Sequence, residues 1–332
     1  MAAAGLRASA ATAAPTGEMK VRRGHVLVPD GTRILLLGGY QIPLPVEEET
    51  WAFDKDGWHR LQVPGPPARV LASAAYDPAN KNVWLFGGLN PMSMTNYGDL
   101  WRWDGSRWNQ MAVGSPGARD HHAATFDRER GRMVVYGGGT AGGKLMLNDV
   151  LEWDGRAWTT LPKNEPGQRA HHAMVYDPIR KVTLLFGGFA PPDNRYRGDT
   201  WLWDGKTWSK ATEDGPCARA RCRMAWDEKR EVVVLYGGDR TRREGERGFQ
   251  ILSDTWIWDG SKWHEVQAQG SGEPKNSGER QGPAERQGPG ERMMHAMAWD
   301  RSTESVLLYG GRFQENTKDD AWRWNGSKWE SQ

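Results

Sequence analysis

The sequence repeats itself about every 50 residues, and this repetition constrains the fold more than any other feature. Each copy has a pair of glycines at the end of an apolar run, and the first glycines of successive pairs lie 49, 50, 50, 50 and 73 residues apart. The six pairs are Gly38-Gly39, Gly87-Gly88, Gly137-Gly138, Gly187-Gly188, Gly237-Gly238 and Gly310-Gly311. A tandem repeat of this length indicates one small structural unit per copy, stacked on its neighbours into a single body.

Every copy begins with an Arg that is followed eight residues later by an Asp. The six pairs are Arg22 and Asp30, Arg69 and Asp77, Arg119 and Asp127, Arg169 and Asp177, Arg219 and Asp227, and Arg292 and Asp300. The register therefore extends into the first copy, although the turn of that copy is two residues shorter.

Within one copy the pattern predicts four short strands. In the fourth copy these are "HHAMVY" and "KVTLLF", separated by "DPIR", and then "DTWLW" and "TWSKA", separated by Asp204-Gly205. Asp-Gly between two alternating apolar stretches is a strong hairpin signal, and every copy has this turn or, in the sixth, Asn325-Gly326. Helical periodicity is absent. The sequence predicts an all-β fold, a six-bladed β-propeller of four-stranded antiparallel blades.

Tryptophan supports this arrangement independently, because sixteen of the 19 tryptophans fall at three repeated places. Two of these places are two residues apart, so both indoles lie on one face of a strand and can fill the wedge between neighbouring blades. The first strand carries small residues instead, such as Ala123, Ala173 and Ala296. Small residues near the axis and large ones outside are the taper that a propeller needs.

The units resemble kelch repeats, in the paired glycines, the "WDG" turn and the tryptophan that follows it. More narrowly they resemble the bacterial kelch type, similar to the central domain of galactose oxidase, written here as "GPxAR..HA..D…LLFGG…DTW.WDG..W" over residues 22–330. The resemblance implies the propeller fold. It leaves function open, since kelch propellers are mostly binding platforms and a minority are enzymes, including copper radical oxidases, sialic acid mutarotases and iron-dependent specifier proteins.

The repeats define the domain organisation. We expect a disordered Ala-rich tail at residues 1–20 and one propeller at residues 21–332, interrupted by a flexible insertion at 268–291. The expected blades are residues 22–62, 69–112, 119–162, 169–212, 219–267 and 292–331. Each blade consists of contiguous chain, so the ring is predicted to close by packing of the first blade on the sixth.

Composition excludes some functions. Lys and Arg number 44 against 42 Asp and Glu, whereas nucleic-acid binders usually have a clear basic excess. No run of eighteen apolar residues exists, so no membrane segment is predicted, and the Ala-rich start is a poor secretory signal. These features favour the cytoplasm, although the compartment is not determined, and we expect a monomer.

The topology of the blades sorts the loops into two rims. Turns between strands one and two, and between strands three and four, are short and uniform, and they share one rim. Loops between strands two and three are long and variable, and they share the other rim with the links between blades. Binding sites are usually built on variable loops that a rigid scaffold positions, so this second rim is the predicted binding face.

The third residue after each repeated Arg is chemically suggestive: His25, Ala72, His122, His172, Cys222 and His295. Imidazoles and one thiol near an axis suit a transition metal such as zinc or copper. A group that almost every blade carries more often serves the blade itself, here through a hydrogen bond across the inner strands. No cofactor is predicted on this basis, and His25, His122, His172, Cys222 and His295 stay as candidate metal ligands.

Cys222 has a second possible role. A thiol beside Arg221 and Arg223 is a candidate reactive cysteine, if the arginines depress its pKa. The alternative is a small buried residue that takes the place of histidine.

Arginines form the candidate ligand site. The repeated arginines start the inner strands on the variable rim, where they can meet an anionic ligand or pair with carboxylates and carbonyls of the protein. The fourth and fifth blades add further basic and aromatic residues, which suit a carboxylate, a phosphate or an acidic peptide. The predicted ligand-binding residues are Arg119, Arg169, Arg195, Tyr196, Arg197, Arg219, Arg221, Arg240, Arg242 and Arg243.

Three functions are compatible with this pattern. The first is a noncatalytic scaffold that binds a protein or acidic peptide, or a small anionic ligand, through the variable rim. The second is an enzyme with a small-molecule site at the channel mouth, which can include a metal held by the inner-strand histidines. The third is a carbohydrate-binding module, which needs exposed aromatic residues in the loops. The first is the preferred prediction, and no catalytic residue is assigned.

Overall fold

The computed structural model of the chain describes residue 19 and residues 22–40, 48–140, 145–161, 165–190, 195–241, 248–267, 288–314 and 316–332. Met19 aside, the expected tail at residues 1–20 lies outside these ranges, as does the expected insertion at 268–291 up to residue 287.

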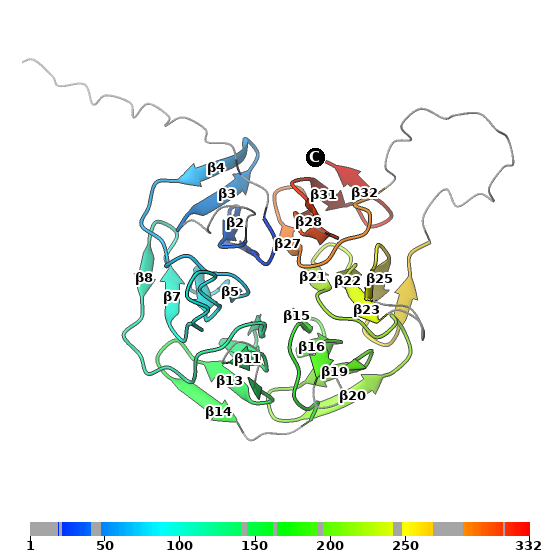
Figure 1. The fold of residues 1–332 in the computed structure, drawn as a ribbon, viewed down its shortest axis with the longest axis horizontal. Helices are drawn as coiled ribbons and strands as arrows, with labels where there is room; N and C mark the ends of the chain where they lie inside the picture. The colour runs from blue at the N-terminus through cyan, green and yellow to red at the C-terminus, as the bar shows by residue number, and fades with distance from the viewer. Residues whose placement is uncertain are drawn as a thin grey trace, which may run out of the picture.

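Six four-stranded antiparallel sheets surround a common axis (Figure 1). The first comprises β1 (Val26–Pro29), β2 (Ile34–Leu37), β3 (Thr50–Asp54) and β4 (Gly57–Leu61). The second comprises β5 (Ser73–Asp77), β6 (Asn82–Phe86), β7 (Leu100–Trp103) and β8 (Trp108–Gln110). The third comprises β9 (Ala123–Asp127), β10 (Arg132–Tyr136), β13 (Val150–Trp153) and β14 (Trp158–Leu161).

The other three sheets follow the same order. The fourth comprises β15 (Ala173–Asp177), β16 (Val182–Phe186), β19 (Thr200–Trp203) and β20 (Trp208–Thr212). The fifth comprises β21 (Arg223–Asp227), β22 (Val232–Tyr236), β25 (Thr255–Trp258) and β26 (Trp263–Glu265). The sixth comprises β27 (Ala296–Asp300), β28 (Ser305–Tyr309), β31 (Ala321–Trp324) and β32 (Trp329–Ser331). The predicted all-β, six-bladed propeller is therefore confirmed.

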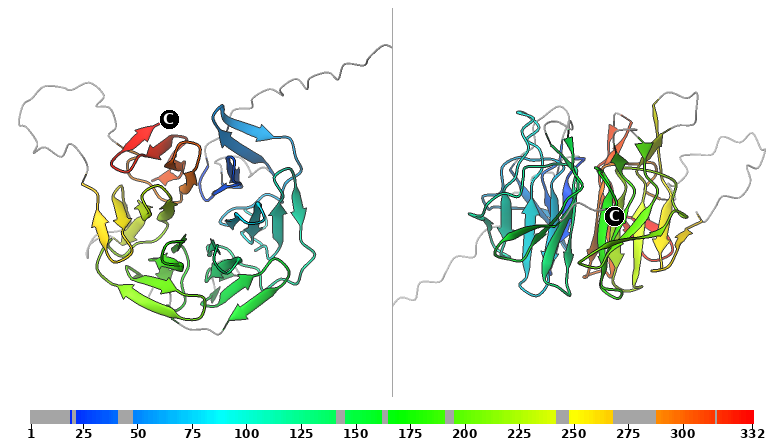
Figure 2. Two further views of the ribbon diagram at one scale, coloured as in Figure 1. Left: turned by 180° about the vertical axis from the view of Figure 1, so that it is seen from behind. Right: turned by 90° about the horizontal axis from the view of Figure 1, so that it is seen from below.

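The ring closes between the first and last blades without exchanging a strand, because each four-stranded sheet is built from one contiguous repeat (Figure 2). Buried Leu27, Leu36 and Trp51 of the first blade pack in one cluster with Ala298 and Leu307 of the sixth. Closure therefore rests on face packing, as the order of the repeats predicts. No helix that could cross a membrane is found in the part of the chain that the structure describes.

Apolar side chains fill the wedges between the blades. Trp103 is 1% exposed and packs with Trp108 of its own blade against Leu35 and Ala52 of the preceding blade. The indoles of Trp103 and Trp108 meet with ring centroids 5.5 Å apart, and the third, fourth, fifth and sixth blades repeat this pair. The predicted indole columns are thus mostly buried, with Trp58, Trp101, Trp158 and Trp256 partly exposed, and burial of such large rings supplies much of the packing between blades.

Within the described residues, four of the variable loops carry an additional small hairpin that the sequence pattern did not predict. These hairpins are β11 (Gly139–Thr140) with β12 (Leu145–Met146), β17 (Phe189–Ala190) with β18 (Arg195–Tyr196), β23 (Asp239–Thr241) with β24 (Phe249–Ile251), and β29 (Arg312–Phe313) with β30 (Asn316–Thr317). Two or three residues per strand are too few for a visible alternation of apolar and polar side chains, which explains why these hairpins were missed. They follow the paired glycines directly.

We call the rim that bears the loops between the second and third main strands the long-loop rim, and the opposite rim the turn rim.

The paired glycines mark a close approach of two backbones. Gly187 has φ of 70°, and a Cβ there would lie 2.6 Å from the carbonyl oxygen of Arg219 in the next blade. The amide of Gly188 donates a hydrogen bond to the same carbonyl at 2.9 Å. Glycine is needed because a side chain would be strained by the positive φ and would collide with this oxygen. The equivalent bond from Gly311 to Arg22 joins the last blade to the first.

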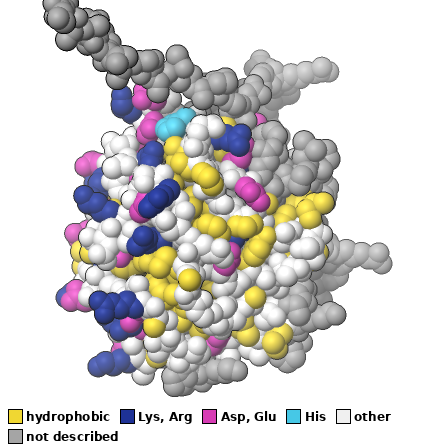
Figure 3. All heavy atoms as spheres, turned by 90° about the vertical axis from the view of Figure 1, so that its left-hand side faces the viewer, with side chains coloured by type: hydrophobic (Ala, Val, Ile, Leu, Met, Phe, Trp, Pro, Cys, Tyr) yellow, Lys and Arg dark blue, Asp and Glu magenta, His cyan; other side chains and the backbone are white. Residues whose placement is uncertain are grey.

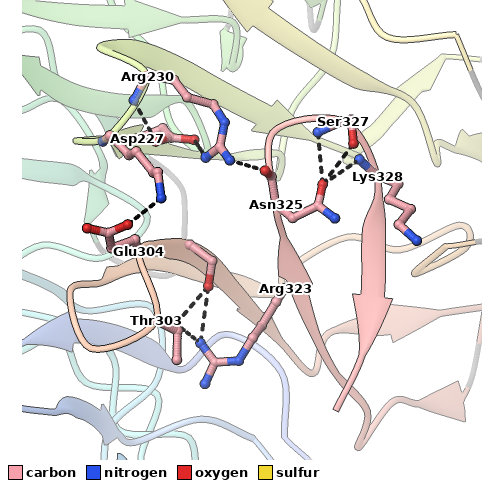
Figure 4. A network of polar contacts seen from close by, with 10 residues as sticks. Asp227, Arg230, Thr303, Glu304, Arg323, Asn325, Ser327 and Lys328 are labelled. Atoms are coloured by element: carbon pink, nitrogen blue, oxygen red, sulfur yellow. Dashed lines mark hydrogen bonds and ion pairs between the residues drawn. The ribbon is translucent and has the colours of Figure 1, made fainter.

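Polar contacts link neighbouring blades on the turn rim. Arg230 of the fifth blade donates to its own Asp227 at 2.8 Å and to the carbonyl of Asn325 in the sixth blade (Figure 4). Arg33 donates likewise to the carbonyl of Gly105 at 3.2 Å. On the side of the ring drawn in Figure 3, charged side chains gather toward one rim and become sparser toward the other.

Candidate functional site

Six residues encircle the axis at the long-loop rim. They are the second residues after the repeated arginines, and we call them the axial ring: Gly24, Leu71, His121, His171, Arg221 and Met294. The amide of each member donates to the carbonyl of the preceding member at 2.9 to 3.2 Å, and the amide of Gly24 donates to Met294. Each member has φ between 53° and 65°. The ring is a closed circle of backbone hydrogen bonds that narrows the channel at this rim.

The left-handed backbone of the axial ring shifts the start of the inner strands. The apolar pattern predicts a strand from His171, but β15 starts at Ala173 because the positive φ of His171 interrupts the extended conformation. Five members of the ring are not glycine, so their residue types do not predict this left-handed conformation.

A cavity of about 230 Å³ follows the axis. The inner strands of all six blades line it, and its charged lining residues are Arg128 and Arg223. Among the described residues, the lining contains no Asp or Glu. Arg128 donates to Glu228 at 2.8 Å, and Glu228 also accepts from Arg301 at 3.2 Å, so these contacts link the third, fifth and sixth blades on the turn rim.

The inner-strand histidines are buried between blades rather than gathered around a metal. The ring of His122 meets that of Phe86 in the preceding blade edge to face, with centroids 5.4 Å apart, and His25, His172 and His295 meet tyrosines in the same way. Within the described ranges, neither ring nitrogen of these four histidines has a well-aligned hydrogen-bond partner. The backbone of Tyr309, Phe86 and Tyr136 in the preceding blade is nevertheless near enough to interact with His25, His122 and His172, so aromatic contact and a weak polar contact act together across the inner strands.

Burial also determines the charge of these groups. It lowers the pKa of both His25 and His122 to about 3, and it holds the pKa of His172 and His295 well below the usual range. In the described part of the chain, no three His, Cys, Asp or Glu side chains converge closely enough to hold a metal ion.

Cys222 is fully buried, and burial raises the pKa of its thiol to about 11 despite the neighbouring Arg219 and Arg223. Its sulfur is therefore protonated at neutral pH, as the structural interpretation of this cysteine requires. Cys217 and Cys222 are both free, and Cys217 accepts a hydrogen bond from Arg219 through its sulfur at 3.2 Å.

The repeated arginines bond carboxylate and carbonyl groups of their own blades. Arg119 is 1% exposed, and its two terminal nitrogens bond both carboxylate oxygens of Asp149 at 2.8 and 2.9 Å. One of these nitrogens also donates to the carbonyl of Gly137 at 3.1 Å. Arg169 and Arg219 repeat this geometry with Asp199 and Asp254. The guanidinium groups thus tie the start of the inner strand to both ends of the variable loop, the pairing that the sequence offered as the alternative to ligand contact.

The carboxylates of these pairs carry a repeated signal that the sequence analysis missed. In the second, fourth, fifth and sixth repeats an Asp stands two residues before the first tryptophan of the third strand, as in Asp99 before Trp101, and the third repeat has Asp149 at the same place before Leu151. Trp101 donates to Asp99 through its indole nitrogen at 2.6 Å, while Asp99 receives both terminal nitrogens of Arg69. Burial alone would raise the pKa of Asp99, but the bonds from Arg69 outweigh it and lower the pKa.

The candidate residues of the fourth and fifth blades do come together. The hairpins β17–β18 and β23–β24 lie side by side, and Tyr196 donates through its hydroxyl to Asp239 at 2.7 Å. Arg221 donates to the same Asp239 at 2.7 Å, so its charge is balanced by this carboxylate. Arg195 is exposed and Arg197 half-buried beside them. Arg240 is half-buried and donates to the neutral amide oxygen of Gln250 at 2.9 Å. Arg242 and Arg243 lie outside the described residues.

Exposed apolar side chains concentrate on the same rim. Five of the six large hydrophobic residues that are exposed in the described ranges belong to the variable loops. These five are Tyr40, Met92, Met94, Leu145 and Phe249, whereas Ile179 stands on the turn rim. Exposed apolar groups beside basic groups are typical of protein interaction surfaces.

The described groups of the cavity and of the rim differ in chemistry. The described lining of the cavity lacks a carboxylate, the pKa of its buried His122 is about 3, and half-buried His121 is hydrogen-bonded to Asp120 at 2.9 Å. General acid–base and nucleophilic catalysis need groups whose pKa lies near the working pH or an activated nucleophile. The rim, by contrast, offers cationic, aromatic and apolar groups to a partner.

Comparison with known proteins agrees with this architecture. The solved structure of YjhT has a TM-score of 0.70 to this chain at 15% sequence identity, and the match covers 94% of this chain and 98% of that chain. In all, 416 chains of solved structures match, so the fold is widespread and the likeness shows the fold alone. No curated protein sequence matches the chain at a significant level.

A family model agrees in sequence as well. The model of the KLHDC2/KLHL20/DRC7 Kelch-repeats domain matches residues 94–281, more than half of the 332 residues. The match covers blades whose glycine pairs, Arg–Asp pairs and indole columns have the geometry described above, and the kelch-propeller fold in general supports a protein-binding scaffold. The chain belongs to the kelch-repeat propellers, in the family of the KLHDC2/KLHL20/DRC7 Kelch-repeats domain.

Proposed function

We propose that the protein is a noncatalytic scaffold that binds an acidic segment of a partner protein through its long-loop rim. The basic part of this contact lies on the fourth and fifth blades, where β18 and β23 lie side by side. The observation that carries the proposal is the concentration of exposed apolar residues in the variable loops of this rim.

Apolar anchors and adaptable loops are the usual source of affinity in protein interfaces. Phe249 is 40% exposed on β24, and Leu145 is 54% exposed on β12. The opposite rim offers mostly paired charges in short turns, such as Lys181 with Glu129. A partner that buries apolar surface therefore gains more from the long-loop rim.

The preference for an acidic partner rests on the charges of this sector. Arg240 has a neutral side-chain acceptor, Gln250, so its positive charge stays available to a partner. Arg195 adds an exposed guanidinium from the adjacent hairpin. Planar guanidinium groups bind carboxylates through paired hydrogen bonds, and complementary charge raises both association rate and specificity.

The alternative from the sequence, an enzyme acting on a small molecule at the channel mouth, has one observation in its favour. The axial cavity exists, and histidines of several blades border it. Half-buried His121 lines the cavity and is hydrogen-bonded to Asp120 at 2.9 Å, so an enzymatic role would use this pair.

Binding of short fluorescent peptides tests the scaffold proposal. The probe is a peptide that alternates Glu with Leu and Phe, compared with the same peptide in which Gln replaces every Glu. We expect the acidic peptide to bind more tightly, with an affinity that falls as salt rises. Arg240→Glu combined with Arg195→Glu weakens binding, whereas Arg156→Glu, an exposed change on the turn rim, leaves it unchanged.

The apolar contribution has its own matched pair. Phe249→Ser removes an exposed side chain from the long-loop rim, and Ile179→Ser removes one from the turn rim. Loss of affinity in Phe249→Ser alone supports the assignment of the face. The assignment would be refuted by equal effects of both changes on affinity, or by a peptide affinity that the charge-reversal variants leave unchanged.

A further inference from the structure

One residue breaks the pattern of small side chains along the axis. The fourth residue after each repeated Arg is the first residue of an inner strand, and the six residues are Val26, Ser73, Ala123, Ala173, Arg223 and Ala296. Five blades thus place a small or β-branched side chain there, and the fifth places a guanidinium group. Because a blade folds well with Ala at this position, packing alone does not call for Arg223.

Arg223 lines the axial cavity and has no acidic partner there. Its single hydrogen bond within the described residues runs from one terminal nitrogen to the carbonyl of Cys222 at 3.0 Å. Asp and Glu are missing from the described lining of the cavity. The other lining cation, Arg128, is balanced by Glu228. Most of the five N–H donors of Arg223 therefore have no protein acceptor within the described residues.

The side chain of Arg223 is half-buried in the axial channel. Burial is the main cause that lowers the pKa of Arg223 itself. Burial is also the main cause that lowers the pKa values of His25, His172 and His295, and the charge of Arg223 lowers them further. These histidines belong to the first, fourth and sixth blades, so the guanidinium acts on groups from several sides of the channel.

A half-buried positive charge without a counterion is costly, since it has lost part of its hydration and gained no ion pair. The walls of the channel expose polar and apolar groups in similar proportion, the apolar ones from strand residues such as Ala123 and Met224. In such surroundings the attraction between Arg223 and an anion is stronger than at the protein surface.

We propose that the axial cavity is a binding site for a small monoanion, a carboxylate or a singly charged inorganic anion, held by the guanidinium of Arg223. The site is separate from the protein-binding rim. Two parallel N–H donors of Arg223 meet two oxygens of a carboxylate, or one or more oxygens of an inorganic anion. One uncompensated cation in the described lining favours a single negative charge. The volume of about 230 Å³ exceeds that of several waters, each taking roughly 30 Å³, so a small anion fits with its remaining hydration.

Arg223→Ala is a suitable test because Ala occupies this position in three other blades. Arg223→Ser is a second variant, chosen because the second blade has Ser73 at the same position, and Arg156→Ala removes an exposed arginine as the control. Equilibrium dialysis with labelled acetate, chloride and phosphate near pH 6 measures bound anion, and Tm is followed across the same concentrations at matched ionic strength.

We expect native protein to bind about one anion per chain and its Tm to rise as that anion is added. The Tm rises because a ligand that binds only the folded state stabilises it. Arg223→Ala and Arg223→Ser lose at least about nine tenths of the bound anion and the associated rise in Tm, whereas Arg156→Ala keeps both. The anion that half-saturates the protein at the lowest concentration shows whether a carboxylate or an inorganic ion is preferred.

The proposal is overturned if native protein binds none of the three anions at millimolar concentration, or if the Arg223 variants retain the anion dependence of native protein. Dialysis of native protein decides the matter even if a variant fails to fold. Peptide binding at the long-loop rim is unaffected by Arg223→Ala, so failure of this inference is distinguishable from failure of the proposed scaffold function.

Discussion

The amide nitrogen of Gly24 lies 2.9 Å from the carbonyl oxygen of Met294, and this hydrogen bond joins the first repeat to the last. It completes the axial ring, in which five similar bonds connect the other blades in order. A propeller without an exchanged strand depends on such contacts and on face packing for closure. The ring also separates the two candidate sites, because the loops lie at its rim and the cavity follows the axis through the inner strands.

Missing hydrogen bonds between blades offer a route to greater stability. The indole nitrogen of Trp263 donates to the hydroxyl of Thr200 in the preceding blade at 2.9 Å. The equivalent indole of Trp208 has no partner within the described residues, because Val150 takes the place of the threonine. We expect Val150→Thr to raise the free energy of unfolding by about 1 kcal/mol, since it supplies an acceptor to a buried donor.

The reverse change is the control. Thr200→Val removes the acceptor from Trp263 and is expected to cost about 1–2 kcal/mol. Urea denaturation measures both variants. Loss of stability in Val150→Thr would show that the hydroxyl is not accommodated where the indole can reach it.

Two glycines with similar positive φ values show whether glycine is required by a nearby atom or only by the backbone conformation. Gly137 has φ of 61°, and a Cβ there would lie 2.5 Å from the carbonyl oxygen of Arg169. Gly131 has φ of 63° with open space around it. Gly131→Ala should cost about 1 kcal/mol through its positive φ alone. Gly137→Ala should cost several times as much in thermal or urea denaturation, and similar costs would remove the close approach as the reason for the paired glycines.

Buried neutral histidines should make the propeller sensitive to mild acid. The pKa of His122 is lowered by burial from 6.5 to about 3. Between these values the unfolded chain binds a proton that the folded protein does not, so stability falls as the pH falls below 6.5. For one such histidine the loss between pH 7 and pH 5 is about 2 kcal/mol.

His122→Ala tests this prediction, because the second blade has Ala72 at the same place. The variant starts less stable but should lose about 2 kcal/mol less than native protein between pH 7 and pH 5. His59→Gln, at a half-buried position on the outer strand β4, is the control. Parallel curves for His122→Ala and native protein would contradict the burial of a neutral imidazole.

The fold was predictable because the same constraints act six times. Asp-Gly turns, paired glycines and indole columns each recur at fixed spacing. A pattern that agrees in six copies does not arise by chance, so it identifies the strands and turns. The start of the inner strands was harder to predict. Leu71 and His171 adopt a left-handed backbone only because hydrogen bonds from neighbouring blades hold them there, and a local pattern does not reveal contacts between distant repeats.

The candidate site was predicted less completely. Repetition alone did not show whether Arg119 faces a ligand or a carboxylate, although Asp149 recurs in register and was the available clue. Arg223 was visible as an exception in its column, but its position in the cavity depends on the packing of all six blades around the axis. The loops of the binding rim vary freely, so their arrangement follows from the fold rather than from a motif.

We infer that arginines shared by the blades build the propeller, whereas the unshared Arg223 serves a ligand. The free energy of unfolding of Arg119→Met and Arg223→Ala, measured in a buffer poor in small anions, tests this inference. Arg119→Met leaves the buried Asp149 without its cation and should lose about 3 kcal/mol or more. Arg223→Ala should be at least as stable as native protein, since it removes an unpaired charge. A large loss in Arg223→Ala together with a negligible loss in Arg119→Met would contradict the account.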